Sequence, residues 1–196
     1  MLYIFDFDYT LFDTARFKKD FYALFDDLVF DSSNLKIDYF KENKIHYNIE
    51  EHLNLLGQNL KNYNYALKVL KSFLSDLGEY IFPGAENILI KSKNDNHKLI
   101  LISWGNMAWQ KDKVYGSGME KFFEKTLFTD SSKKEVLESI DIREGETVII
   151  INDNVRESLE MMKYIDNCKL FLVQGPYSEN GYGIASHQLE EIIDFK

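Results

Sequence analysis

The sequence predicts an α/β fold, a three-layer, doubly wound parallel sheet with a set of helices inserted into it. Five short runs are apolar on both faces, which is typical of buried parallel strands; they are residues 2–5, 99–102, 126–128, 147–151 and 170–173. Parallel strands need crossover connections, and these are usually helices. The candidate helices recur along the sheet-forming part of the chain, at residues 86–93, 107–117, 133–140, 155–164 and 186–193.

One interval breaks this βα rhythm. Between residues 14 and 82 there is no strand-like run flanked by turns, and apolar residues there recur at spacings of three and four, which predicts a helical stripe of Leu60, Tyr63, Leu67, Leu70, Leu74 and Leu77. The stripe is too short for a persuasive heptad array, so ordinary packing explains it better than a coiled-coil partner does. The Pro83-Gly84 pair marks the return to the sheet. At 196 residues, the chain has room for one domain with an insertion, whereas two full domains would be tight.

Charge and cysteine content limit the partners. The net charge is −9, from 32 acidic and 23 basic residues, so the field of the protein repels nucleic acids and anionic membranes. Cys168 is the single cysteine and cannot form an internal disulfide, which favours a reducing, cytoplasmic compartment. No targeting signal is evident, and no run approaches the roughly 18 apolar residues of a membrane span, so we expect no membrane partner.

Two carboxylates follow the first predicted strand. Asp6 and Asp8 point to the same side of an extended segment, because side chains alternate along it. Carboxylates this close repel each other unless a cation or a shared proton compensates. A hard divalent cation with oxygen ligands would do so, and Mg²⁺ is the usual one where phosphate is also bound. On these two residues alone, a polar loop at the end of a strand is an equally good interpretation.

Polar residues also follow the next three predicted strands, at the edge where ligands bind in parallel sheets. Ser103 ends the second strand and could hold an anionic oxygen, although such a serine more often forms a turn. Lys133 starts the helix after the third strand, where the helix dipole opposes a cation, so it could be kept there to bind an anion or the carboxylate cluster. A solvated pair of Lys133 and Lys134 is the alternative interpretation. Asp153 and Glu157, after the fourth strand, could face a metal or cap the next helix.

These four segments, taken in order, resemble the motifs of the haloacid dehalogenase superfamily of phosphatases and phosphotransferases. Residues 6–11, Asp-Phe-Asp-Tyr-Thr-Leu, are similar to its first motif, DxDx(T/V)(L/V). Ser103 matches its Ser/Thr motif, Lys133 its lysine motif, with Lys134 as the fallback, and residues 152–157 its strand followed by GDxxxD. The resemblance implies the sheet order 5-4-1-2-3. It also implies a helical cap of the family's first type at residues 15–82, with 1–14 and 83–196 as the core domain.

Three positions depart from the family pattern. Asn152 stands where the family usually has Gly, Glu157 stands where Asp is commoner, and Tyr9 replaces a frequent Gly. Asn tolerates a positive φ better than other non-glycine residues do, so the turn at Asn152 can form. We expect these departures to affect metal affinity and rate, and to leave the fold unchanged.

The resemblance implies covalent catalysis at the DxD pair. Asp6 would attack phosphorus and form an aspartyl-phosphate. Asp8 would protonate the leaving oxygen and then deprotonate the water that releases phosphate. Mg²⁺ would be bound by Asp6, Asp8 through its backbone carbonyl, and Asp153.

The same resemblance assigns the other residues. Ser103 and Lys133 would hold the phosphoryl oxygens, and Thr10 would support the loop or touch phosphate. Glu157 would lie beyond the metal ligands and accept from a metal-bound water. The dehalogenase branch lacks the second acid, so Asp8 disfavours dehalogenation.

We therefore expect a Mg²⁺-dependent phosphatase that acts on a small, soluble phosphorylated metabolite. A phosphotransferase or mutase of the same family, or a catalytically quiet binding module with this fold, is the alternative. A nucleic-acid end-processing phosphatase is least favoured because of the acidic balance. Arg16, Lys18 and Lys19 are candidates to bind an anionic substrate tail. The substrate and the oligomeric state are not encoded in any motif.

Overall fold

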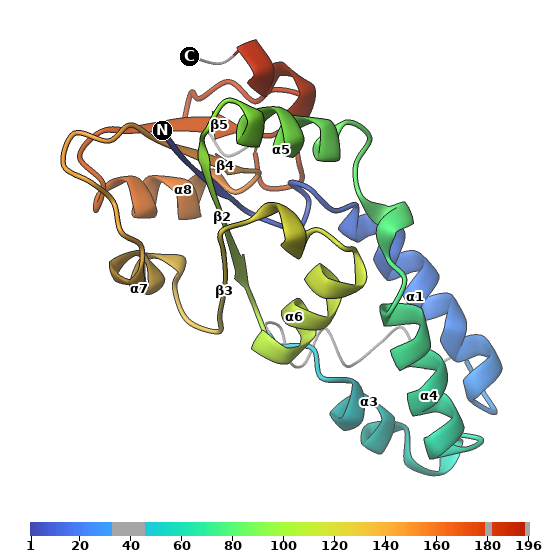
Figure 1. The fold of residues 1–196 in the computed structure, drawn as a ribbon. Helices are drawn as coiled ribbons and strands as arrows, with labels where there is room; N and C mark the ends of the chain where they lie inside the picture. Colours follow the sequence, from blue (N-terminus) through green and yellow to red (C-terminus); the bar gives the residue numbers. More distant parts are fainter. Residues whose placement is uncertain (33–45, 179–181, 195–196) are drawn as a thin grey trace.

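A five-stranded parallel sheet forms the centre of the protein (Figure 1). The structure, a computed structural model, describes residues 1–32, 46–178 and 182–194. The strands are β1 (Leu2–Phe5), β2 (Lys98–Trp104), β3 (Lys125–Thr129), β4 (Val148–Asn152) and β5 (Cys168–Leu172), in the order β3-β2-β1-β4-β5. Both the α/β class and the sheet order expected from the sequence are confirmed. The central position of β1 puts the DxD segment in the middle of the carboxyl edge of the sheet.

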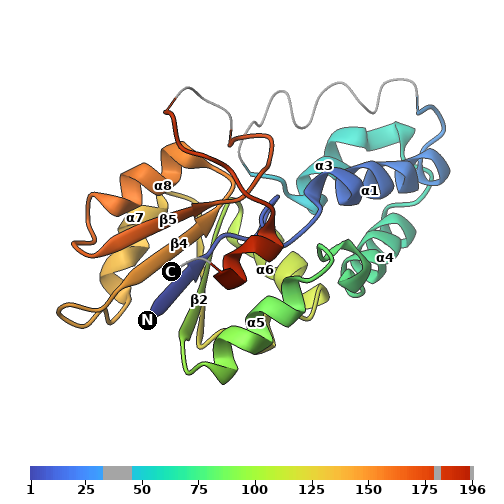
Figure 2. The same cartoon turned by 90° about the horizontal axis from the view of Figure 1, so that it is seen from above.

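Helices cover both faces of this sheet (Figure 2). On one face lie α5 (Ala85–Asn94) and α6 (Met107–Gly116), and on the other α7 (Lys133–Val136) and α8 (Val155–Met162). In β1, Tyr3 and Phe5 face the first pair of helices, while Leu2 and Ile4 face the second. The strands are apolar throughout because alternate side chains are buried on opposite faces.

The described part of the segment between β1 and α5 contains helices joined by loops, and no strand of the sheet. It contains α1 (Thr14–Leu28), α3 (Ile49–Leu56) and α4 (Tyr63–Leu74), which pack together beside the sheet (Figure 1). Asp13 caps α1 by accepting a hydrogen bond from the Arg16 N–H at 3.0 Å. Residues 33–45 of the predicted insertion lie outside the described residues. The division into a cap at 15–82 and a core domain stays a prediction.

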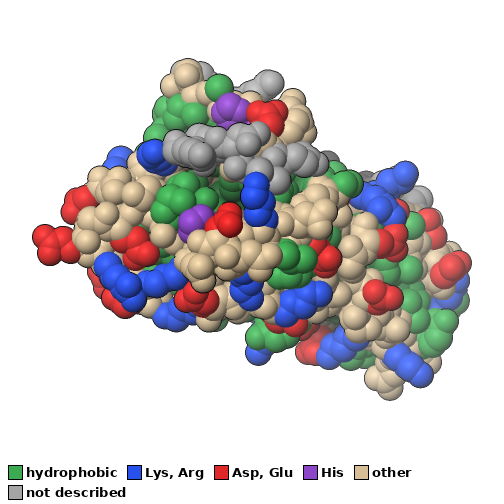
Figure 3. All heavy atoms as spheres, turned by 45° about the horizontal axis from the view of Figure 1, so that its top comes forward, with side chains coloured by type: hydrophobic (Ala, Val, Ile, Leu, Met, Phe, Trp, Pro, Cys, Tyr) green, Lys and Arg blue, Asp and Glu red, His purple; other side chains and the backbone are tan. Residues whose placement is uncertain are grey.

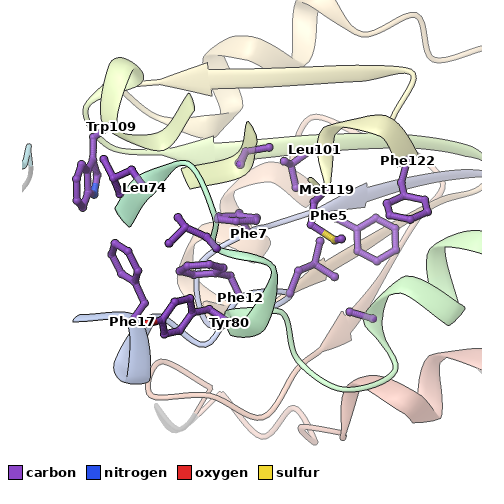
Figure 4. Close-up of a cluster of buried hydrophobic side chains, with 14 of the residues drawn as sticks. Phe5, Phe7, Phe12, Phe17, Leu74, Tyr80, Leu101, Trp109, Met119 and Phe122 are labelled. Carbon is purple, nitrogen blue, oxygen red and sulfur yellow. The ribbon is translucent and has the colours of Figure 1, made fainter. Parts of the chain in front are cut away.

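The inserted helices share one hydrophobic cluster with the sheet (Figure 4). The rings of Phe7 and Phe12 stack with centroids 4.9 Å apart, and Phe12 lies 5.2 Å from Phe17 of α1. Phe17 in turn lies 5.8 Å from Trp109 of α6. A continuous set of aromatic contacts therefore holds the inserted helices against the edge where the DxD segment lies.

The last predicted helix, residues 186–193, is wrong in its first half. Only Leu189–Asp194 is helical, as a 3₁₀ helix. The His187 N–H donates to the Leu172 carbonyl at 2.8 Å, and the Gln174 N–H donates to the His187 carbonyl at 2.8 Å. These bonds extend β5 as a parallel bridge, so the backbone at His187 cannot also enter a helix. The predicted helix at 133–140 also splits, into α7 and a 3₁₀ turn at Leu137–Ser139.

The remaining boundaries differ from the prediction by two residues at most, and both ends of β1 match it. Among the described residues, no helix is long and apolar enough to cross a bilayer.

Candidate active site

A cavity of about 310 Å³ opens at the carboxyl edge of the sheet. Five of the residues predicted for the site line it, namely Asp6, Asp8, Lys133, Asp153 and Glu157. Thr10 and Ser103 are buried beside it, with exposed fractions of 0% and 1%. The topology explains the gathering, because β1, β3 and β4 all end at this edge.

Asp6 is buried and held by two donors. Its Oδ1 accepts from Lys133 Nζ at 2.6 Å, and its Oδ2 accepts from Thr10 Oγ1 at 3.1 Å. Burial raises the pKa of Asp6, and although the Lys133 ammonium lowers it, Glu157 and Asp8 add to the rise. The net direction is upward from the ordinary value. A further cation beside Asp6 would favour its ionised, nucleophilic form.

Lys133 links two carboxylates at the start of α7. Its Nζ lies 2.6 Å from Asp6 Oδ1 and 2.7 Å from Glu157 Oε2. Burial disfavours the ammonium, but the two carboxylates outweigh this and raise the pKa of Lys133 above its ordinary value. The structure thus brings Lys133 into contact with Asp6, whereas its expected contact with phosphate stays a prediction. Glu157, expected to accept from a metal-bound water, is paired with Lys133.

Asp153 carries an unpartnered oxygen. Burial, with the nearby Asp6 charge, raises the pKa of Asp153 to about 8. Its Oδ2 is buried and has no hydrogen-bond partner among the described residues. A buried carboxylate oxygen without a donor is costly, and a cation would satisfy it.

This donor set fits Mg²⁺. Within the described part of the chain, no three side chains of His, Cys, Asp or Glu gather as a metal cluster. The ligands implied by the resemblance are different in kind: the carboxylates of Asp6 and Asp153 with the backbone carbonyl of Asp8. All three are oxygens, and Mg²⁺ typically takes one or two protein carboxylates and keeps several waters.

Thr10 joins the loops that follow β1 and β4. Its hydroxyl donates to Asp6 Oδ2 at 3.1 Å and accepts from the Asp153 N–H at 3.1 Å. Thr10 therefore ties the Asp6 carboxylate to the backbone of the loop after β4, and a contact with phosphate stays a prediction.

The loops accommodate two of the departures from the family pattern differently. Tyr9 has φ 60°, a left-handed conformation that costs a non-glycine residue about 1–2 kcal/mol. Its N–H donates to the Phe12 carbonyl at 2.9 Å, and its ring lies 5.8 Å from that of Tyr177. Asn152 does not have a positive φ; its side-chain oxygen accepts from the Asn154 N–H at 2.9 Å and forms the turn.

Asp8 has partners that the sequence did not indicate. Lys113 Nζ lies 2.5 and 2.7 Å from its two oxygens, Gln110 Nε2 donates at 3.0 Å and Thr14 Oγ1 at 2.6 Å. Burial would raise the pKa of Asp8, but the Lys113 charge and these hydrogen bonds together lower it below the ordinary range. The available signal was helical spacing, since Lys113 follows the buried Trp109 by four residues on α6.

The other expected phosphate contacts are not all placed in the cavity. Ser103 is buried in the last part of β2, and the N–H of Gly105, two residues further on, donates to the Thr129 carbonyl at 2.8 Å. Of the three basic candidates for a substrate tail, Lys18 lines the cavity. The Arg16 guanidinium instead contacts both the side-chain carboxylate and the backbone carbonyl of Glu79.

Aromatic side chains form much of the remaining wall. Trp104 is 38% exposed there, and Trp109, which also belongs to the core, lines the cavity too. Tyr9, His46, Tyr47 and Tyr177 also line the cavity.

Solved structures with the same fold cover nearly the whole chain. One, described as a haloacid dehalogenase-like hydrolase from Burkholderia xenovorans, has a TM-score of 0.69 and 20% identity, covering 99% of this chain and 95% of its own. A second, described as a beta-phosphoglucomutase from Thermotoga maritima, has a TM-score of 0.62 and 19% identity, covering 99% of this chain and 97% of its own. A third is described as the haloacid dehalogenase-type hydrolase YfnB from Bacillus subtilis bound to magnesium. It has a TM-score of 0.59 and 18% identity, covering 98% of this chain and 96% of its own.

Other matched structures are dehalogenases. No protein-family model and no curated protein matches the sequence.

Proposed function

We propose that this protein, whose fold is that of the haloacid dehalogenase-like hydrolases, is a Mg²⁺-dependent phosphatase that hydrolyses a small phosphomonoester. One observation carries the proposal. Asp6 is held by Lys133 at 2.6 Å in the same cavity as Asp153, whose Oδ2 has no hydrogen-bond partner among the described residues. A fixed nucleophile, a buried cation and an unsatisfied second carboxylate are what a site for a metal-bound phosphate requires.

The reaction would proceed in two steps on Asp6. Its carboxylate oxygen attacks phosphorus, the bond from phosphorus to the ester oxygen breaks, and the alcohol leaves with a proton. Water then attacks the aspartyl-phosphate, the bond from phosphorus to the Asp6 oxygen breaks, and inorganic phosphate leaves. Lys133 stabilises the negative phosphoryl oxygens, and Asp8 exchanges the protons, which is typically worth about 10²- to 10⁴-fold in rate.

Asp6, Asp153 and the Asp8 carbonyl would hold the Mg²⁺. When bound, the ion would reduce the repulsion between the Asp6 carboxylate and a phosphate dianion. Four carboxylates line this cavity, those of Asp6, Asp8, Asp153 and Glu157. Lys133 pairs with Asp6 and Glu157, and Lys113 pairs with Asp8.

The cavity suits a small metabolite. Its volume lies at the lower end of the roughly 300–1,000 Å³ typical of small-molecule sites. On the face drawn in Figure 3, acidic and basic side chains are interspersed, and the whole chain carries a charge of −9. These features favour a soluble phosphorylated metabolite in the cytoplasm over nucleic acid or a membrane as partner.

The test is release of phosphate from p-nitrophenyl phosphate and a panel of phosphorylated metabolites, with Mg²⁺ and with excess chelator. Asp6→Asn should abolish turnover, because an amide oxygen is a poor nucleophile. Asp13→Asn is the matched control: it makes the same change seven residues away, and Asn still caps α1. Full activity of Asp6→Asn, or of the wild type in chelator, would contradict the proposal.

The same assay separates the alternatives. A phosphotransferase or mutase would deliver phosphate to an added acceptor alcohol in preference to water. A dehalogenase would release halide from a 2-haloacid, which the presence of Asp8 disfavours. A catalytically quiet binding module would show no turnover and no calorimetric binding of Mg²⁺ or a phosphate analogue.

A further inference from the structure

Lys113 is a buried cation that belongs to none of the four motif segments. Its side chain is 3% exposed, and its Nζ lies 5.8, 5.7 and 6.0 Å from the ring centroids of Phe7, Phe12 and Phe17. A buried ammonium among apolar rings is costly unless it is closely paired. Asp8 provides that pairing, with one oxygen at 2.5 Å and the other at 2.7 Å.

Two helices that are far apart in the sequence, α1 and α6, both contact the Asp8 carboxylate. Gln110 and Lys113 lie three apart on one face of α6, and both donate to Asp8. Thr14, the first residue of α1, donates to Asp8 Oδ1 at 2.6 Å. Each oxygen thus receives two donors, while the Asp8 side chain remains 23% exposed toward the cavity. The group is oriented, yet one side of it can still meet a substrate.

Orientation matters because the cavity contains other carboxylates. Asp6 and Asp153 line the same space, and their negative charges repel that of Asp8. An unrestrained Asp8 would rotate toward solvent and away from the ester oxygen. Proton transfer needs donor and acceptor within about 2.6–3.2 Å, so a rotation of this kind would remove it.

We propose that Lys113 is a positioning residue, which holds the Asp8 carboxylate at the cavity and offsets the charge of the neighbouring carboxylates. This inference rests on the proposed function, since it assigns Lys113 a part in the proton transfers made by Asp8. Lys113 acts through Asp8 and does not contact the phosphoryl group.

The test compares Lys113→Met with Lys111→Met. Lys111 is exposed on the same helix, so the control makes the same change without touching the cavity. Lys113→Met should lower kcat by between about 10- and 100-fold, part of the roughly 10²- to 10⁴-fold that a positioned acid–base supplies, and should change KM by less than about threefold. Lys113→Arg, which keeps the charge, should recover part of kcat.

A second comparison separates positioning from mere folding. Asp8→Asn/Lys113→Met should be no slower than Asp8→Asn, because Lys113 has nothing left to orient. All variants are checked by circular dichroism and thermal unfolding, and rates are normalised to folded protein. A structural role alone would lower the melting temperature and leave kcat per folded molecule unchanged.

The outcomes are distinct. An active wild type with unchanged kcat in Lys113→Met overturns the role of Lys113 and leaves the proposed function standing. A rise in KM without a fall in kcat also overturns it, because Lys113 would then be binding substrate. A wild type that releases no phosphate overturns the proposed function, and the inference with it.

Discussion

A Cβ atom at position 175 would lie 2.8 Å from Oδ2 of Asp153 and 2.7 Å from its Cβ. The loop after β5 therefore approaches this carboxylate as closely as a glycine allows. The oxygen concerned is the one without a hydrogen-bond partner among the described residues, so Gly175 sets the space in which Asp153 would meet the proposed Mg²⁺.

Gly175→Ala should weaken Mg²⁺ binding by roughly 10- to 100-fold, the usual effect of changing a residue that supports a metal ligand. The added methyl group pushes against Asp153 and rotates its carboxylate. Calorimetric titration with Mg²⁺ measures the effect. Gly78→Ala is the control, because a Cβ there meets nothing within 4 Å. Undiminished affinity in Gly175→Ala would mean that Asp153 does not bind the metal or that the loop yields.

The sheet was predictable because buried parallel strands leave a strong local signal. The run that became β1 is apolar at every position, and its two boundaries match the prediction. The helix predicted at 186–193 failed because the residues near His187 bond to the end of β5, a contact between segments that periodicity does not report. Strand ends shifted for the same reason, since pairing with a neighbour decides where a strand stops.

The site was predictable where residues follow strands in a recognisable order. The grouping of Asp6, Lys133 and Asp153 could be predicted because the order of the strands that they follow was predicted correctly. Lys113 was missed because it lies in the run Gln-Lys-Asp-Lys, which resembles a solvated helix face. Burial of one lysine out of such a run depends on how α6 packs against the inserted helices, which the local sequence does not specify.

Lys133→Met should lower the free energy of unfolding by about 3 kcal/mol and abolish turnover, because removing one partner leaves buried carboxylates unpaired. Asp6 is 8% exposed, and both Asp6 and Glu157 would lose their cation. Lys134→Met is the adjacent control and should keep most of its stability and activity. Chemical denaturation and phosphate release measure the two effects. Equal losses in both variants would show that the wrong lysine has been assigned.

The free energy of unfolding should fall in acid because the unfolded chain binds a proton at His52 more readily than the folded protein does. This ring is 4% exposed, stacks on Phe25 at 4.7 Å and has its Nδ1 2.9 Å from the Tyr47 hydroxyl. Burial lowers the pKa of His52 to about 4, so the folded state binds the proton less readily than the unfolded chain. The stabilisation is complete above about pH 6.5 and is lost as the pH falls from there toward 4.

The loss attributable to His52 should reach roughly 3 kcal/mol at pH 4, at about 1.36 kcal/mol for each pKa unit. His52→Gln cannot titrate, so the difference in unfolding free energy between it and the wild type should shrink by that amount from pH 8 to pH 4. Urea unfolding across this range measures it. The value at pH 8, where the ring is neutral in both states, is the internal control for packing. A difference that stays constant with pH would show that His52 does not titrate in this way.

Gly116→Ala should destabilise the contact between α4 and α6. Its Cβ would lie 1.8 Å from the Leu74 carbonyl oxygen, and that backbone cannot move freely because the Leu77 N–H donates to the Gly116 carbonyl at 2.8 Å. Overpacking usually costs about 1–3 kcal/mol, and a clash with backbone belongs at the upper end. In a chain of this size, about 3 kcal/mol lowers the melting temperature by roughly 6–12 °C. Gly78→Ala should change it little, so similar melting temperatures for the two variants would show that the helices do not meet as closely at Gly116 as described.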